Sequence, residues 1–184
     1  MLGKISVHKI TLIALAIVIN IVGSYIALVL HLPIYLDSMG TIMTAILLGP
    51  FYGLFSGALS ALVTGMTSDI YAFYYMPVGI VLGIVTGLVF RRRNLSNKLF
   101  IKAFCISIPA SLISACITAN VFGGITSSGS TMLVQLLAKT PVGLTLSCLI
   151  VQFFTDYFDR LLSLWLVFSV IKKLPDSLTN KLKN

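Results

Sequence analysis

Three charged residues late in the chain have a spacing that could bind a polar molecule. Asp156, Asp159 and Arg160 stand at positions i, i+3 and i+4, so on a helix they share one face. They lie within an apolar stretch, where ionisable groups are costly and usually line a cavity or pair with one another. Two interpretations follow. The residues form an Asp–Arg cluster that satisfies itself and anchors the helix, or Arg160 and a carboxylate hydrogen-bond a small polar ligand.

Other polar residues could complete such a site. Asp69 is followed by three tyrosines, and tyrosine both gathers at membrane interfaces and stacks on flat heteroaromatic rings. The sequence favours neither role over the other. Pockets with aromatic walls and a few polar groups are the usual small-molecule type. The candidate substrate-binding residues are therefore Asp37, Asp69, Tyr71, Tyr74, Tyr75, Asn120, Gln152, Asp156, Asp159 and Arg160.

Motifs for catalysis and for nucleotide or metal binding are missing from the sequence. It has no Gly-x-x-x-x-Gly-Lys-Ser/Thr phosphate loop, no Gly-x-Ser-x-Gly, and no glutamate for a His-Glu-x-x-His site. His8 and His31 have no nearby acid suited to activating a nucleophile. Cys105, Cys116 and Cys148 lack metal-ligand spacing, and we expect them to be small buried packing residues. The sequence predicts no enzyme activity, no metal and no cofactor.

The composition is that of a membrane protein. Of 184 residues, 58% are hydrophobic and only 10% are charged, and the mean hydropathy is +1.03, whereas soluble domains carry about 25% charged residues. A crossing helix needs roughly 20 apolar residues, so the chain has room for about six crossings. We expect an all-α integral membrane protein, a single transmembrane domain over residues 1–184 with helices at about 8–30, 38–49, 51–66, 73–90, 99–122 and 143–171.

The segments between these helices have recognisable breaks. Gly49-Pro50 should separate the second helix from the third, because proline lacks a backbone donor and glycine weakens a helix. The Gly/Ser/Thr-rich stretch 123–130 is typical of an exposed loop. After it, residues 131–138 have a weakly amphipathic pattern.

The net charge of +8 has a topological explanation. Most of the 13 Lys and Arg residues flank the apolar runs, in three clusters: Lys4 and Lys9; Arg91, Arg92, Arg93, Lys98 and Lys102; and Lys172, Lys173, Lys181 and Lys183. Cytoplasmic loops hold excess Lys and Arg, so we expect both termini in the cytoplasm and no nucleic-acid partner. The candidate site residues then gather toward the opposite, extracellular side, with Asp156, Asp159 and Arg160 in the outer half of the last crossing.

Small residues recur every fourth position in two stretches, which are Gly49, Gly53, Gly57, Ala61 and Gly65, and then Gly79, Gly83 and Gly87. This spacing puts them on one stripe of a helix, where the missing side chains let two backbones approach closely. The stripes indicate either close packing between helices of this chain or a smooth face that docks on a partner's helices.

The order of these features resembles the S component of an energy-coupling factor (ECF) vitamin transporter over nearly the whole chain. The residues that carry the resemblance are Asp37-Ser-Met-Gly-Thr41, Leu48-Gly-Pro50 with Gly53 and Gly57, Asp69 with the tyrosines after it, Gly79/Gly83/Gly87, and Asp159-Arg160. The last pair is similar to an Asp-Lys pair of the family, with Arg in place of Lys.

The resemblance implies a substrate-capture subunit of an ABC-type importer in a bacterial cell membrane. Such a subunit binds a vitamin at the outer side and works with a transmembrane coupling protein and two cytoplasmic ATPases. Members of the family contact the coupling protein through an Ala-x-x-x-Ala face on the first helix, and this chain matches that pattern in part. The resemblance therefore implies Ala14, Ala16 and Gly23 as partner-binding residues.

The site residues favour a small, neutral or singly charged heteroaromatic substrate, because tyrosine rings stack and Asp or Arg can pair with amino, hydroxyl or pyridinium groups. Vitamin B6 forms and the hydroxymethylpyrimidine precursor of thiamine fit this chemistry; folate, cobalamin, riboflavin, pantothenate and queuosine stay open. The alternative function is a stand-alone secondary carrier or channel, since discontinuous helices at Gly49-Pro50 and near Asp37 could form an ion site.

Overall fold

The computed structural model describes residues 6–91 and 98–175, and within these ranges the regular secondary structure is entirely helical. The helices are α1 (Val7–Val29), α2 (Met39–Leu48), α3 (Pro50–Thr67), α4 (Ile70–Tyr74), α5 (Met76–Val89), α6 (Leu99–Asn120), α7 (Ser130–Ala138) and α8 (Leu144–Ile171). The expected all-α fold is confirmed. The basic residues Lys4, Arg92, Arg93, Lys181 and Lys183 lie outside the described residues.

Two of the described helices, α1 and α6, are long and apolar enough to cross a membrane by length and composition. The apolar helices α2 and α5 are shorter. At 1.5 Å per residue, the 10 residues of α2 reach about 15 Å, half of a hydrocarbon core of about 30 Å. The count of six crossings therefore stays a prediction.

The boundary between α2 and α3 lies at Gly49-Pro50, as the sequence predicts. Gly49 has φ +102° and ψ 177°, a conformation that costs glycine little because it has no Cβ. Pro50 then begins α3, where its missing N–H leaves no helical bond unmade. The chain thus reverses sharply between two helices that pack on each other.

The expected helix 73–90 is divided, which corrects its predicted start. The short helix α4 ends at Tyr74, and α5 begins at Met76, with Pro77 in its first turn. Pro77 has no N–H to continue the hydrogen-bond ladder of α4, so the chain turns at Tyr75. The weakly amphipathic segment near 131–138 is the separate helix α7.

The two glycine stripes pack against each other inside this chain. α3 and α5 form the most extensive helix pair, and a Cβ added to Gly79 would lie 2.9 Å from the carbonyl oxygen of Gly57. A Cβ on Gly53 would lie 2.9 Å from the carbonyl oxygen of Gly83. The stripes therefore allow backbone-to-backbone contact between α3 and α5, which is the first of the two interpretations above.

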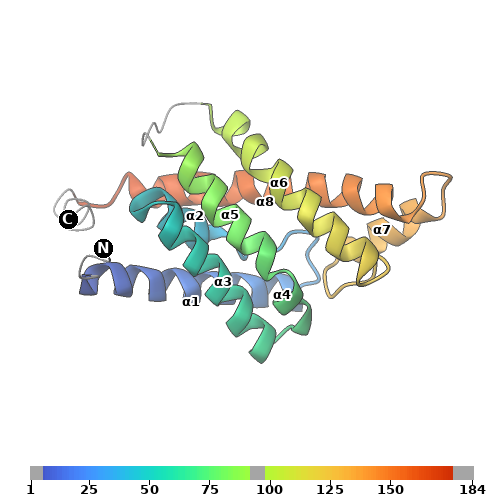
Figure 1. The fold of residues 1–184 in the computed structure, drawn as a ribbon, viewed down its shortest axis with the longest axis horizontal. Helices are drawn as coiled ribbons and strands as arrows, with labels where there is room; N and C mark the ends of the chain where they lie inside the picture. The colour runs from blue at the N-terminus through green and yellow to red at the C-terminus, as the bar shows by residue number, and fades with distance from the viewer. Residues whose placement is uncertain (1–5, 92–97, 176–184) are drawn as a thin grey trace.

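α1 and α8 are the longest helices, and Figure 1 shows them running lengthwise while α3, α5 and α6 cross them obliquely. The start of α1 and the end of α8 lie toward the same end of the molecule, at the left of the view, and α4 and α7 lie toward the other. The main hydrophobic core fills the space among α2, α5, α6 and α8; it includes Ile42, Ile46, Phe90, Ile106 and Leu164.

Candidate functional site

A cavity of about 100 Å³ lies among α1, α3, α4, α5, α8 and the segments before α2 and α7. On the same measure a single water needs about 10–15 Å³, so the space suits a small molecule. Six of the ten candidate substrate-binding residues line it: Asp37, Asp69, Tyr71, Tyr75, Asp156 and Arg160.

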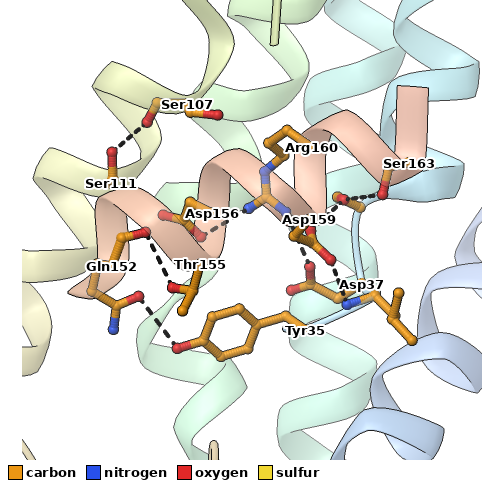
Figure 2. A network of polar contacts seen from close by, with 12 residues as sticks. Tyr35, Asp37, Ser107, Ser111, Gln152, Thr155, Asp156, Asp159, Arg160 and Ser163 are labelled. Carbon is orange, nitrogen blue, oxygen red and sulfur yellow. Dashed lines mark hydrogen bonds and ion pairs between the residues drawn. The ribbon is translucent and has the colours of Figure 1, made fainter. Parts of the chain in front are cut away.

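Arg160 lies at the centre of the charged groups, as Figure 2 shows. Its Nη1 donates to the carboxylate of Asp159, and this is its closest ion pair. The other two carboxylates are further away: Nη2 is 3.6 Å from Oδ1 of Asp156, and Nη1 is 3.7 Å from Oδ1 of Asp37. Those two distances exceed hydrogen-bond range. Arg160 is therefore hydrogen-bonded to Asp159 and only loosely paired with the other two.

Asp159 holds the segment between α1 and α2 in place. Its Oδ1 accepts a hydrogen bond from the backbone N–H of Leu36 at 2.8 Å, and its Oδ2 accepts one from the Ser38 hydroxyl at 2.9 Å. Ser38 also lies 3.0 Å from the hydroxyl of Ser163, one turn further along α8. Asp159 is fully buried and does not line the cavity. Its role in the structure is thus to anchor, as one interpretation of the charged cluster expects.

Asp156 and Arg160 each keep a buried polar atom without a partner among the described residues. These atoms are Oδ2 of Asp156 and Nε of Arg160. The two side chains are 2% and 3% exposed, so bulk water does not satisfy them. An unpaired buried polar group is costly. The unpartnered oxygen of Asp156, a residue that lines the cavity, therefore points to a donor on a ligand as its missing partner.

Tyr35 is a cavity residue that the sequence analysis missed. Its hydroxyl donates to Oε1 of Gln152 at 3.3 Å and lies 3.4 Å from the hydroxyl of Ser130. Gln152 in turn donates to Thr118, whose hydroxyl lies 2.6 Å from that of Tyr75. These contacts join five parts of the fold at the cavity wall. The one signal for Tyr35 in the sequence is its position two residues before Asp37.

Asn20 is the second residue that was missed, and it lines the cavity from α1. Its amide nitrogen donates to the hydroxyls of Thr41 at 2.8 Å and Ser60 at 3.0 Å, and its oxygen accepts from the N–H of Gly40 at 2.7 Å. A single asparagine in the middle of an apolar helix is the signal that could have found it. It fastens α1 to α2 and α3 at the cavity.

Asp69 lines the cavity where α3 meets α4. Its Oδ1 accepts from the N–H of Tyr71 at 3.1 Å, which caps the start of α4, and its other oxygen accepts from the hydroxyl of Ser127. Ser127 belongs to the Gly/Ser/Thr-rich stretch after α6, and it also lines the cavity. Asp69 therefore joins two segments that are far apart in sequence.

The three tyrosines do not act as one wall. Their rings surround Phe122, with centroids 4.8 Å away for Tyr71, 5.2 Å for Tyr74 and 6.0 Å for Tyr75. Tyr71 and Tyr75 line the cavity. Tyr74 is half exposed and does not.

Four candidate residues do not line the cavity, because they lie on helix faces that point away from it. Tyr74 points to the surface, and Asn120 is exposed and bonded to the carbonyl of Cys116 in its own helix. Gln152 and Asp159 are buried behind the cavity wall. The charged cluster lies near the middle of α8, and its expected place in the outer half of the last crossing stays a prediction.

Of the three expected partner-binding residues on α1, two are buried and one is exposed. Ala16 is fully buried where α1 meets α2, and a Cβ added to Gly23 would collide with the backbone of Leu36. Their small size thus serves packing within the chain, which corrects the expectation for both. Ala14 is exposed. Two of the three cysteines, Cys105 and Cys116, are exposed as well, and only Cys148 is buried as expected.

Comparisons with curated proteins and with solved structures find no match. A family model described as the substrate-specific component of ECF transporters matches residues 8–176, a range that holds all the helices described above except the first residue of α1, and the whole cavity. This is the family whose features the sequence resembles, and its members are substrate-binding subunits of membrane transporters rather than enzymes. The chain belongs to the family of ECF transporter substrate-specific components.

Proposed function

We propose that this chain captures a small water-soluble vitamin or vitamin precursor at the extracellular side of a bacterial cell membrane. It delivers this cargo inward together with a transmembrane coupling protein and two cytoplasmic ATPases. Family membership supports a substrate-binding subunit that associates with such components. The observation that carries the proposal is the cavity of about 100 Å³, which is lined by Asp156 and Arg160, and in which Asp156 keeps an oxygen without a partner among the described residues.

The size and lining of the cavity support a ligand with a single ring. Tyr71 and Tyr75 offer aromatic contacts, while Asp156 and Arg160 offer directional polar ones. Vitamin B6 forms and the hydroxymethylpyrimidine precursor of thiamine combine one flat heteroaromatic ring with amino or hydroxyl groups.

The orientation follows from charge. Lys9, Lys172 and Lys173 lie near the start of α1 and the end of α8, which share one end of the molecule (Figure 1). The positive-inside rule favours that end in the cytoplasm. Asp69 and the 126–128 segment, near α4 and α7, then face outward.

Ligand binding by the purified protein in detergent micelles tests the proposal. We expect isothermal titration with a panel of water-soluble vitamins and their precursors to find at least one that binds at micromolar concentration or tighter. Ala61 lines the cavity, and Ala58 lies one turn earlier on α3 and does not. Ala61→Leu should therefore abolish binding, whereas Ala58→Leu should retain it.

Two further results bear on the partners. Copurification with a coupling protein and ATPases supports the importer, and uptake into liposomes should require them. No binding by any vitamin contradicts the capture role. Uptake into liposomes that contain this chain alone would instead favour a secondary carrier.

A further inference from the structure

We infer that the cavity selects ligands that carry a positive charge or amino-type hydrogen-bond donors and rejects those that carry a carboxylate or phosphate. The inference rests on the proposed function, since it names the class of substrate that the same site takes. The expected ligand is a small heteroaromatic ring that bears an amino group or a protonated nitrogen.

The first support is the imbalance of charge around the cavity. Among the described residues that line it, three are aspartates, Asp37, Asp69 and Asp156, and one is a cation, Arg160. A fourth carboxylate, that of Asp159, lies directly behind Arg160. Charges this close to a low-dielectric interior interact much more strongly than in water. An anionic ligand would add a further negative charge, whereas a cation would reduce the excess.

The second support is that Arg160 is already engaged. A carboxylate or phosphate is best bound by an arginine that presents two parallel N–H donors. Here Nη1 donates to Asp159, and Nη2 faces Asp156 at 3.6 Å. Asp159 cannot be released cheaply, because it also accepts from Leu36 and Ser38. Nη1 is therefore occupied and Nε is buried, so Arg160 presents no accessible pair of parallel N–H donors to an anion.

The third support is an unpartnered oxygen of Asp156, a residue that lines the cavity. Oδ2 of Asp156 is a buried acceptor that no described group satisfies, and the side chain is 2% exposed. An ammonium, amino or ring N–H group of a ligand would supply its missing donor.

Matched ligands that share a ring but differ in charge test the inference on the full chain in detergent. Pyridoxamine carries an aminomethyl group where pyridoxic acid carries a carboxylate on the same ring. Nicotinamide likewise carries a neutral carboxamide where nicotinate carries a carboxylate. Titration of these pairs and of the vitamin panel should find the amino or amide member at least tenfold tighter wherever either member binds. The tightest ligand of the panel should be cationic or carry amino donors.

A tightest ligand that is anionic, or that lacks amino or protonated nitrogen donors, overturns the inference but leaves the capture role intact. A panel in which nothing binds overturns both. The two failures are therefore distinguishable.

The variant Asp156→Asn separates charge from shape. Asparagine is nearly the same size, so the cavity keeps its form, but the free acceptor loses its charge. We expect at least a tenfold loss of affinity for the tightest cationic or amino ligand and a smaller preference over its anionic counterpart. Lys139→Gln is the control, because Lys139 is exposed at the end of α7, outside the cavity. An Asp156→Asn protein that is monodisperse and keeps the full preference contradicts the inference.

Discussion

Two isosteric substitutions three residues apart on α8 should have opposite effects on stability and on binding. Asp159 accepts hydrogen bonds from Leu36 and Ser38 and contacts Arg160 directly. Asp156 makes one contact with Arg160, at 3.6 Å. We therefore expect Asp159→Asn to destabilise the fold strongly and Asp156→Asn to leave it nearly unchanged, while Asp156→Asn has the specific effect on the ligand.

The size of the effect follows from these contacts. Removing one partner of a buried ion pair costs about 3–5 kcal/mol, because the other charge is left uncompensated. In Asp159→Asn, the asparagine would also present either its side-chain oxygen or its NH2 group to Arg160. An NH2 group in that position would face another hydrogen-bond donor. By contrast, Asp156→Asn loses a contact beyond hydrogen-bond length and relieves repulsion with Asp159, so we expect a change within about 1 kcal/mol.

Thermal unfolding of the purified variants in detergent provides the measurement. For a chain of this size each kcal/mol shifts the midpoint by about 2–4 °C, so Asp159→Asn should lower it by about 6–20 °C. Asp156→Asn should unfold within about 4 °C of the natural protein. Equal losses in the two variants would refute the separation of an anchoring carboxylate from a ligand-facing one.

Three other predictions concern packing, capping and assembly. Gly57→Ala should destabilise the protein by about 1–3 kcal/mol in thermal unfolding, because its Cβ would meet the backbone of α5, whereas the surface change Leu59→Ala should have little effect. Asp69→Ala removes the cap of α4 and the bond from Ser127, so hydrogen exchange in α4 should become faster; unchanged exchange would contradict the capping role. Ala14→Trp should reduce copurification with the coupling protein without changing ligand affinity, since Ala14 is exposed; undiminished copurification would count against this surface.

The sequence predicts much of the fold because its signals are local. Gly49-Pro50 marks the α2–α3 boundary through backbone chemistry alone. The glycine spacing on α3 and α5 predicts close helix contact, and α5 proves to be the partner. The division at Tyr75 also has a local signal, Pro77, which is outweighed in the sequence by the continuous apolar run around it.

The site was harder to predict, because the orientation of a side chain depends on which helices pack together. The i, i+3, i+4 spacing groups Asp156, Asp159 and Arg160 correctly but cannot tell the carboxylate that faces a loop from the one that faces a cavity. Tyr35 and Asn20 were missed because their partners lie far away in sequence, on α2, α3, α7 and α8. Only tertiary structure brings such groups together.

The bond between Leu36 and Asp159 has a consequence for biogenesis. Leu36 has a positive φ of 52°, which a branched residue rarely adopts, and its N–H is held by a carboxylate 123 positions later. While the chain is being synthesised, that carboxylate reaches the bilayer only with the final helix. The segment before α2 therefore acquires its native shape late, after most of the protein has been inserted, and a chain truncated before α8 would lack the carboxylate that holds it.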